Sequence, residues 1–129
     1  MRVAVYGTLR RGERNHRVLW SLAPAAAPAF LGTTRLSERW GLWNLGSFPA
    51  VVARSGGGGA RVLVEVFDVP RGVLRALDLL EGHPGFYRRQ RVEVSFGEGK
   101  LFPVEVYVLP RERLPADARP IPSGDWLKR

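Results

Sequence analysis

The segment Arg61–Val69 constrains the fold more strongly than any other part of this chain. Valines occupy alternate positions from 62 to 66 and share one face of the predicted strand, while Leu63 and Phe67 lie on the opposite face. A strand that is apolar on both faces must be covered on both sides. The segment therefore favours a small closed or nearly closed barrel, or a covered sheet.

The rest of the chain divides into short elements of both kinds. Apolar patterns predict strands over Arg2–Tyr6, Phe30–Leu36, Gly41–Leu45, Ala50–Ala53, Tyr87–Phe96 and Phe102–Leu109. A short helix is predicted over Asn15–Leu22, and a second helix opens at Pro70 and ends at Gly82. The apolar stripe of this second helix consists of Val73, Leu74, Leu77 and Leu80.

These elements predict an α+β fold, because short strands outnumber helices and no regular alternation of the two is present. We expect a small mixed β-barrel of about six short strands, with one main helix and a short second helix. A chain of 129 residues is most simply one domain, residues 1–129. The tail Pro110–Arg129 is rich in proline and mostly irregular, although Trp126 can pack over the barrel.

The glycine run Ser55–Gly59 is the segment that most resembles a phosphate-binding loop. Such a loop needs a following helix with Lys and Ser or Thr, and this chain has none there. The run is therefore interpreted as a hairpin or surface loop.

The chain is strongly basic, with a formal net charge of +8. Nucleic-acid binding is one interpretation of this charge, but the basic runs are no longer than two residues apart from Arg88–Arg91, and aromatic residues do not interleave with them. A solvated basic surface is the simpler interpretation, and it would also draw anionic metabolites towards a cleft. We expect a monomer without a nucleic-acid partner.

Several classes of site and location are excluded or disfavoured by composition. The chain has no cysteine, which excludes disulfides, thiolate zinc sites and thiol nucleophiles. The only histidines, His16 and His83, lack suitably spaced carboxylates and make a poor metal site. No apolar run approaches the ~20 residues of a membrane span, and no signal peptide is visible, so a cytoplasmic protein is expected. Scarce lysine and abundant proline hint at a heat-adapted source.

Glu81 is the first candidate for chemistry, because it follows the predicted helix directly. The negative end of the helix dipole disfavours a carboxylate there, and shielding from water would raise its pKa further. A glutamate with a raised pKa can exchange protons near neutral pH, as general acid–base catalysis requires. The alternative is that Glu81 is a solvated residue of the last turn.

The turn Tyr6–Leu9 is the second candidate, because it follows a hydrophobic strand. Gly7 allows close approach of the backbone to a ligand, and the amides of Gly7, Thr8 and Leu9 can bind a carboxylate. An ordinary turn at the end of a strand is the alternative. Tyr87 and Tyr107 can each donate a hydrogen bond into a cavity, or simply pack in the core.

Taken together, these motifs resemble the γ-glutamylcyclotransferase-like family. The matching residues follow the family's order across nearly the full chain: Tyr6–Leu9, Arg11–Gly12, Asn15–His16, Leu77–Gly82, Tyr87–Arg89, Val106–Val108 and Ser123–Trp126. The stretch Asn15–Leu19 is most similar to the γ-glutamylamine cyclotransferase branch.

The resemblance implies a pocket at the end of a small barrel, and a reaction without a metal or organic cofactor. In that reaction the α-amino nitrogen of a γ-glutamyl substrate attacks its own γ-carbonyl, which gives 5-oxoproline and a free amine. The resemblance makes Glu81 the acid–base residue and the Gly7–Leu9 amides the site of the α-carboxylate, with Tyr6 and Tyr87 near the pocket. A non-catalytic module that binds a small carboxylate on the same fold is the alternative.

The resemblance leaves the leaving amine open. The segments expected to select it are Leu36–Pro49 and Pro110–Trp126. Because Trp40, Trp43 and Trp126 lie in them, an apolar or extended leaving group is one possibility.

Overall fold

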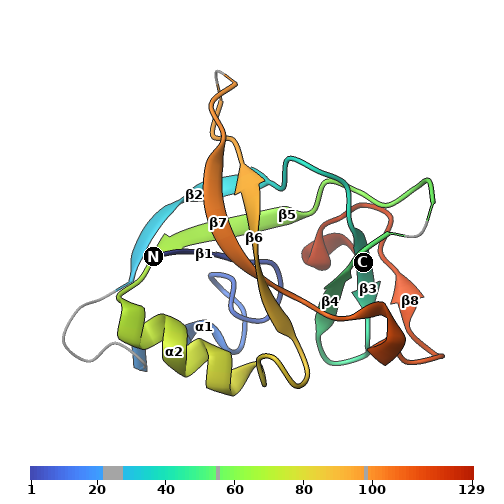
Figure 1. Ribbon diagram of the computed structural model, residues 1–129, viewed down its shortest axis with the longest axis horizontal. Helices are drawn as coiled ribbons and strands as arrows, with labels where there is room; N and C mark the ends of the chain where they lie inside the picture. Colours follow the sequence, from blue (N-terminus) through green and yellow to red (C-terminus); the bar gives the residue numbers. More distant parts are fainter. Residues whose placement is uncertain (22–27, 55, 98) are drawn as a thin grey trace.

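The chain forms a mixed sheet that curls into a half-barrel with two helices (Figure 1). This computed structural model describes residues 1–21, 28–54, 56–97 and 99–129. The strands are β1 (Arg2–Val5), β2 (Ala29–Arg35), β3 (Gly41–Asn44), β4 (Pro49–Val52), β5 (Leu63–Asp68), β6 (Arg88–Val94), β7 (Phe102–Val108) and β8 (Arg119–Pro120). The helices are α1 (His16–Ser21) and α2 (Arg71–Leu80), and 3-10 turns lie at Arg111–Arg113 and Trp126–Lys128.

The sheet follows the order β2-β5-β1-β7-β4-β3-β8, and β6 pairs with β7 outside this path. The pairs β1–β7 and β4–β7 are parallel, and the other pairs are antiparallel. An isolated bridge between Leu36 and Val94 brings the end of β2 to the end of β6, which curls this side of the sheet. The predicted α+β class and mixed sheet are confirmed.

Both faces of β5 are buried, as its alternation predicts. Val64 and Val66 belong to the apolar cluster inside the curled sheet, and Phe67 belongs to a second cluster between the sheet and the helices. The strand also contains one acid, Glu65, which is 4% exposed and lies among these apolar residues. The sheet is therefore covered on both sides around β5.

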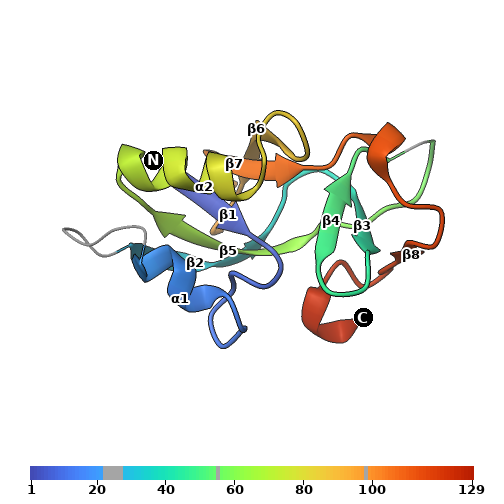
Figure 2. The same cartoon turned by 90° about the horizontal axis from the view of Figure 1, so that it is seen from below.

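The two helices lie at the end of the molecule that holds β1, β5 and β2, away from β3, β4 and β8 (Figures 1 and 2), and Figure 2 shows them apart from each other. Val73, Leu74 and Leu77 of α2 are buried in the outer cluster, as predicted. The expectation that Leu80 continues this buried stripe is wrong, because its side chain is 56% exposed. The helix ends at Leu80, and this residue lines a cavity instead of packing against the sheet.

The tail contains more regular structure than expected. Residues Arg119–Pro120 form β8, which pairs with β3, and Trp126 is buried in the inner cluster. A two-residue strand has no periodicity of its own, so only its partner strand reveals it. The predictions for Leu22, at the end of the first helix, and for Ser55, in the glycine run, lie outside the described residues.

Among the described residues, the helices are all too short or too polar to cross a membrane.

Candidate active site

The two candidate segments line one cavity of about 360 Å³. The turn Gly7–Leu9 follows β1 on one side, and Glu81 follows α2 on the other. Other parts of the wall come from the end of β1, from Phe48 before β4 and Pro49 at its start, and from Tyr107 of β7. Residues that are about 70 positions apart in the sequence therefore face the same space, as the resemblance implies.

The backbone of the Gly7–Leu9 turn is held so that its carbonyl groups have partners and its amides do not. The Gly7 carbonyl accepts from the Arg10 amide at 3.0 Å, and the Thr8 carbonyl accepts from the Asn15 amide at 3.0 Å. The Leu9 carbonyl lies 2.9 Å from Nδ1 of His16. Within the described residues, none of the three amide N–H groups of this turn donates to a protein acceptor. Such donors require a partner from solvent or a ligand.

His16 holds the turn through a defined tautomer. Trp20 Nε1 donates to His16 Nε2 at 3.2 Å, so Nε2 is the acceptor nitrogen. The proton then lies on Nδ1, which donates to the Leu9 carbonyl. Asn15 adds a side-chain bond from Nδ2 to Thr8 Oγ1 at 3.1 Å. Both residues therefore position the candidate anion site from α1 and the residue before it.

A buried ion cluster, Arg10–Glu65–Asp125, fixes the far end of the same turn. Arg10 is 5% exposed, and its guanidinium donates to Glu65 Oε2 at 3.1 Å and to Asp125 Oδ1 at 2.9 Å. Glu65 Oε1 also accepts from the Arg11 amide at 2.9 Å. The cluster joins the turn to β5 and to the C-terminal segment, and each of its acids has at least two donors.

Gly7 is required by space rather than by its backbone angles. A Cβ atom built on Gly7 would lie 2.6 Å from Cγ of Pro49. Real Cβ atoms do not come so close to a neighbour, so any side chain would force the turn away from β4. The close approach of Gly7 to Pro49 therefore sets the width of the cavity.

The end of α2 places Glu81 by a Schellman motif, in which Gly82 adopts a left-handed conformation with φ of 68°. The Gly82 amide donates to the Leu79 carbonyl at 3.2 Å, and the His83 amide donates to the Asp78 carbonyl at 2.8 Å. The predicted helix end at Gly82 is confirmed. The chain then folds back, and the Tyr87 amide donates to the Glu81 carbonyl at 3.3 Å.

Burial raises the pKa of Glu81 from 4.5 to about 7. The side chain is half-buried at the cavity wall, and no donor of the described residues forms a hydrogen bond with its carboxylate. Desolvation without compensation destabilises the charged form. The carboxyl group is therefore close to half-protonated at neutral pH, which is the condition for both accepting and donating a proton.

Three tyrosine rings line the cavity, but their hydroxyl hydrogens are used within the protein. Tyr6 Oη donates to the Tyr107 carbonyl at 2.7 Å and accepts from the Val51 amide at 3.2 Å. Tyr87 Oη donates to the Pro49 carbonyl at 2.9 Å. Burial raises the pKa of Tyr6 and of Tyr87, so both stay protonated. Their contact with a ligand would come mainly from the rings.

Tyr107 belongs to a polar network behind Glu81. Its hydroxyl donates to Asp78 Oδ1 at 2.7 Å, and Arg89 donates to the same oxygen at 2.8 Å. Burial alone would raise the pKa of Asp78, but the bonds from Tyr107 and Arg89 outweigh it and lower the pKa. Arg89 also binds Glu105 at 2.9 Å. Part of the basic run Arg88–Arg91 is thus neutralised inside the protein.

His83 lies two residues after Glu81 in the sequence, and its ring contacts the start of β6. Its Nδ1 accepts from the Arg89 amide at 2.8 Å. This bond ties the loop after α2 to the start of β6.

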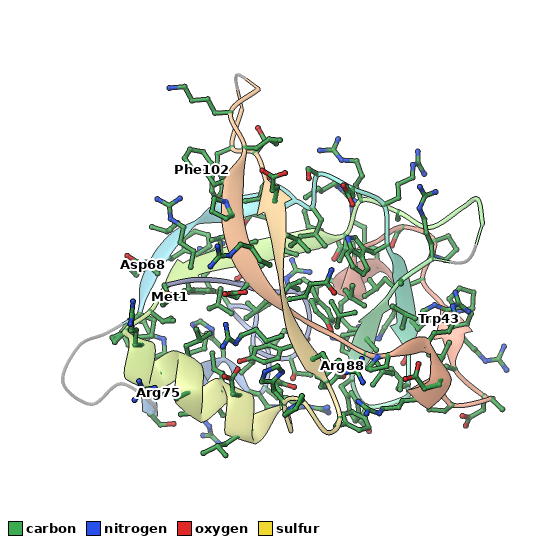
Figure 3. All side chains as sticks on the ribbon, in the orientation of Figure 1. Met1, Trp43, Asp68, Arg75, Arg88 and Phe102 are labelled. Atoms are coloured by element: carbon green, nitrogen blue, oxygen red, sulfur yellow. The ribbon has the colours of Figure 1, made fainter. Side chains whose placement is uncertain are left out.

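The three tryptophans expected near the leaving amine do not line the cavity. Trp40 and Trp126 are buried in the inner cluster, and none of the tryptophans Trp40, Trp43 and Trp126 lines the cavity. Figure 3 shows Trp43 on β3, on the side of the molecule away from α2 and its Arg75. Tryptophan is highly buried on average, and sequence alone does not separate a tryptophan of the core from one at a ligand site.

Sequence reasoning assigned no role at the site to four residues that hold it: Arg10, Asn15, His16 and Glu65. Glu65 leaves a visible signal, because it is a single acid in an otherwise apolar strand. Such a residue must be paired when buried, and the two arginines after Leu9 are candidate partners. Asn15 and His16 stand among the residues that carry the family resemblance, but one sequence does not indicate which groups they contact.

The chain is similar to known proteins over nearly its whole length. The family described as "Gamma-glutamyl cyclotransferase, AIG2-like" matches residues 3–128. A putative gamma-glutamylcyclotransferase of Vibrio cholerae is 35% identical over 98% of this chain and 96% of its own length. A gamma-glutamylaminecyclotransferase of Bos taurus is 37% identical over 95% of this chain and 73% of its own. The crystal structure of an AIG2-like protein from Mus musculus superposes with a TM-score of 0.80 at 27% identity, covering 96% of this chain and 87% of that one.

Proposed function

The chain belongs to the AIG2-like γ-glutamyl cyclotransferase family, and we propose that it converts a γ-glutamyl amine or amide to 5-oxoproline and a free amine. One observation carries this proposal: Glu81 and the free amides of Gly7–Leu9 line the same cavity. One group can move a proton, and the others can bind an anion.

In this proposal the amides of Gly7–Leu9 bind the α-carboxylate of the substrate. Three donors without protein partners suit an anion, and no cationic side chain is needed to hold it. The carboxylate anchors one end of the glutamyl chain. The chain can then fold so that its α-nitrogen approaches the γ-carbonyl, and this positioning supplies much of the rate.

Glu81 acts as the general acid–base residue. Its carboxylate takes one proton from the α-ammonium group, and the freed nitrogen attacks the γ-carbonyl carbon to form the ring C–N bond. Glu81 then gives that proton to the nitrogen of the leaving amine as the old amide bond breaks. The second proton of the ring nitrogen ends on the released amine, which is an ammonium ion at neutral pH. A pKa of about 7 suits both transfers.

The test is a screen of γ-glutamyl compounds with 5-oxoproline as the readout, performed on wild type and on Glu81→Gln. The amide keeps the shape of the side chain but cannot shuttle a proton, so we expect turnover to fall by roughly 10²- to 10⁴-fold. Glu93→Gln is the matched control, because Glu93 is exposed on β6 and does not line the cavity. Turnover by Glu81→Gln close to that of wild type would refute the role of Glu81.

The alternative is a module that binds a small carboxylate without converting it. A γ-glutamyl compound that raises the melting temperature of the wild type, yet is recovered unchanged after incubation, would favour that alternative over the enzyme. The same screen therefore separates the two functions.

A further inference from the structure

Three exposed apolar side chains surround the mouth of the candidate active site. Phe48, Leu80 and Phe86 are 38%, 56% and 42% exposed, and all three line the cavity. They come from three separate segments: the turn before β4, the end of α2 and the loop before β6. Apolar surface of this kind is unfavourable in water, and its convergence on one opening indicates a ligand contact.

Few charged side chains line the cavity. Among the described residues that line it, Glu81 is the only carboxylate and Arg14 is the only lysine or arginine. Arg14 is exposed and donates to the Ser47 carbonyl, which bridges the turn after β1 and the turn before β4. A ligand that leaves the cavity through its mouth therefore passes apolar side chains and one cation, with no second acid to balance a positive charge.

We propose that this mouth is a subsite for the leaving amine, and that it selects an amine with an apolar group and no additional positive charge. The inference rests on the proposed function, since the inner cavity then holds the glutamyl part and Glu81. Beyond that part, Phe48, Leu80 and Phe86 are the large exposed apolar side chains of the described lining that the amine can contact. An additional ammonium group would have to lose water beside apolar side chains and face the guanidinium of Arg14.

The test compares three donors that differ only in the leaving amine: the γ-glutamyl amides of methylamine, of butylamine and of 1,4-diaminobutane. We expect kcat/KM for the butylamide to exceed that for the methylamide about tenfold. This ratio corresponds to about half of the free energy of transferring three methylene groups from water to an apolar site. The diaminobutane amide has the same chain length with a terminal ammonium group, and we expect its kcat/KM to lie at least about tenfold below that of the butylamide.

Two variants with matched controls assign the effect to the mouth. Leu80→Ala should lower the butylamide-to-methylamide ratio several-fold, whereas Leu79→Ala should not, because Leu79 is 85% exposed and does not line the cavity. Arg14→Gln should reduce the penalty for the diaminobutane amide, whereas Arg17→Gln, an exposed residue of α1 outside the cavity, should not. Using ratios removes any general loss of active protein from the comparison.

The outcomes separate the two proposals. Equal kcat/KM for the three donors, or a preference for the diaminobutane amide, would overturn the subsite while leaving the cyclotransferase intact. Failure of all three donors and of the wider γ-glutamyl screen to give 5-oxoproline would overturn the proposed function and the subsite with it.

Discussion

The fold shifts the pKa values of two acids, Glu81 and Asp125, in opposite directions. Asp125 is 5% exposed, and its carboxylate accepts hydrogen bonds from Arg10 and from the Leu127 amide. Burial acts to raise its pKa, but these bonds outweigh it and lower the pKa. Glu81 is half-buried at the cavity wall, and burial raises its pKa to about 7, with no hydrogen bond from the described residues to lower it.

The contrast shows that hydrogen-bond donors and nearby cations decide whether a buried carboxyl group keeps a raised pKa or has it lowered. Asp125 and Glu65 are paired in the buried ion cluster, so they connect segments and hold the turn that carries the free amides. Among the described residues, none donates such a bond to Glu81, so its pKa lies near neutrality, and the residue lines the cavity. One region stabilises the site, and the other is available for chemistry.

The largest expected effect comes from removing the shared cation of the ion cluster. Arg10→Ala leaves Glu65 and Asp125 buried without their main partner, and breaking a buried pair from one side costs about 3–5 kcal/mol. Urea unfolding at pH 7 should show this loss in the free energy of unfolding. Arg17→Ala, an exposed arginine on α1, is the control and should change it by less than about 0.5 kcal/mol. A similar small change in Arg10→Ala would mean that the cluster is not a stabilising element.

Asp125→Asn keeps the shape of the side chain but weakens the two bonds that depend on its charge. We expect a loss of about 2 kcal/mol in the free energy of unfolding at pH 7. Because the folded pKa is lowered, this contribution is present above the unfolded value of 3.8 and is lost as the pH falls through the folded pKa. The difference between variant and wild type should therefore shrink in acid. A difference that stays constant from pH 7 to pH 3 would contradict the charged role of Asp125.

Glu81→Gln should change the free energy of unfolding in the opposite direction, because it should stabilise the protein. The unfolded group releases its proton near pH 4.5 and the folded group near pH 7, so ionising Glu81 lowers the stability of the wild type as the pH rises between these values. The variant has no such cost. Since the group is partly exposed, we discount the full shift and expect a gain of about 1–2 kcal/mol at pH 8 and none at pH 4. Melting temperatures of both proteins at the two pH values test this, and a variant less stable than wild type at pH 8 would contradict it.

The same proton affinity should govern the rate. If Glu81 must be ionised to accept the first proton, kcat/KM rises about tenfold per pH unit below pH 7 and levels off above it, with an apparent pKa of about 7. Glu93→Gln, which leaves the cavity unaltered, should reproduce this profile. A profile that is flat from pH 5 to pH 8 would remove Glu81 from the proton transfer.

Part of the fold and of the candidate site could be predicted from the sequence. The double-faced strand β5 and the helix end at Gly82 depend on local periodicity and local backbone geometry, and both were predictable. The partners of Arg10 are 55 and 115 positions away in the sequence, so no local pattern encodes the ion cluster. The predicted burial of Leu80 was wrong for a related reason. Periodicity shows which face of a helix is apolar, but it does not show where the elements that cover this face end.

The smallest expected effect concerns Tyr87, which touches both kinds of environment. Its ring lines the cavity, while its hydroxyl donates to the Pro49 carbonyl and so belongs to the framework. Tyr87→Phe removes one buried hydrogen bond and should cost about 1 kcal/mol in the free energy of unfolding. Because the ring remains, turnover should fall less than about fivefold. Thermal unfolding and 5-oxoproline kinetics measure the two effects. If turnover instead falls by about two orders of magnitude while stability is unchanged, this hydroxyl must turn from Pro49 to the reacting atoms, and Tyr87 would then join Glu81 rather than the framework.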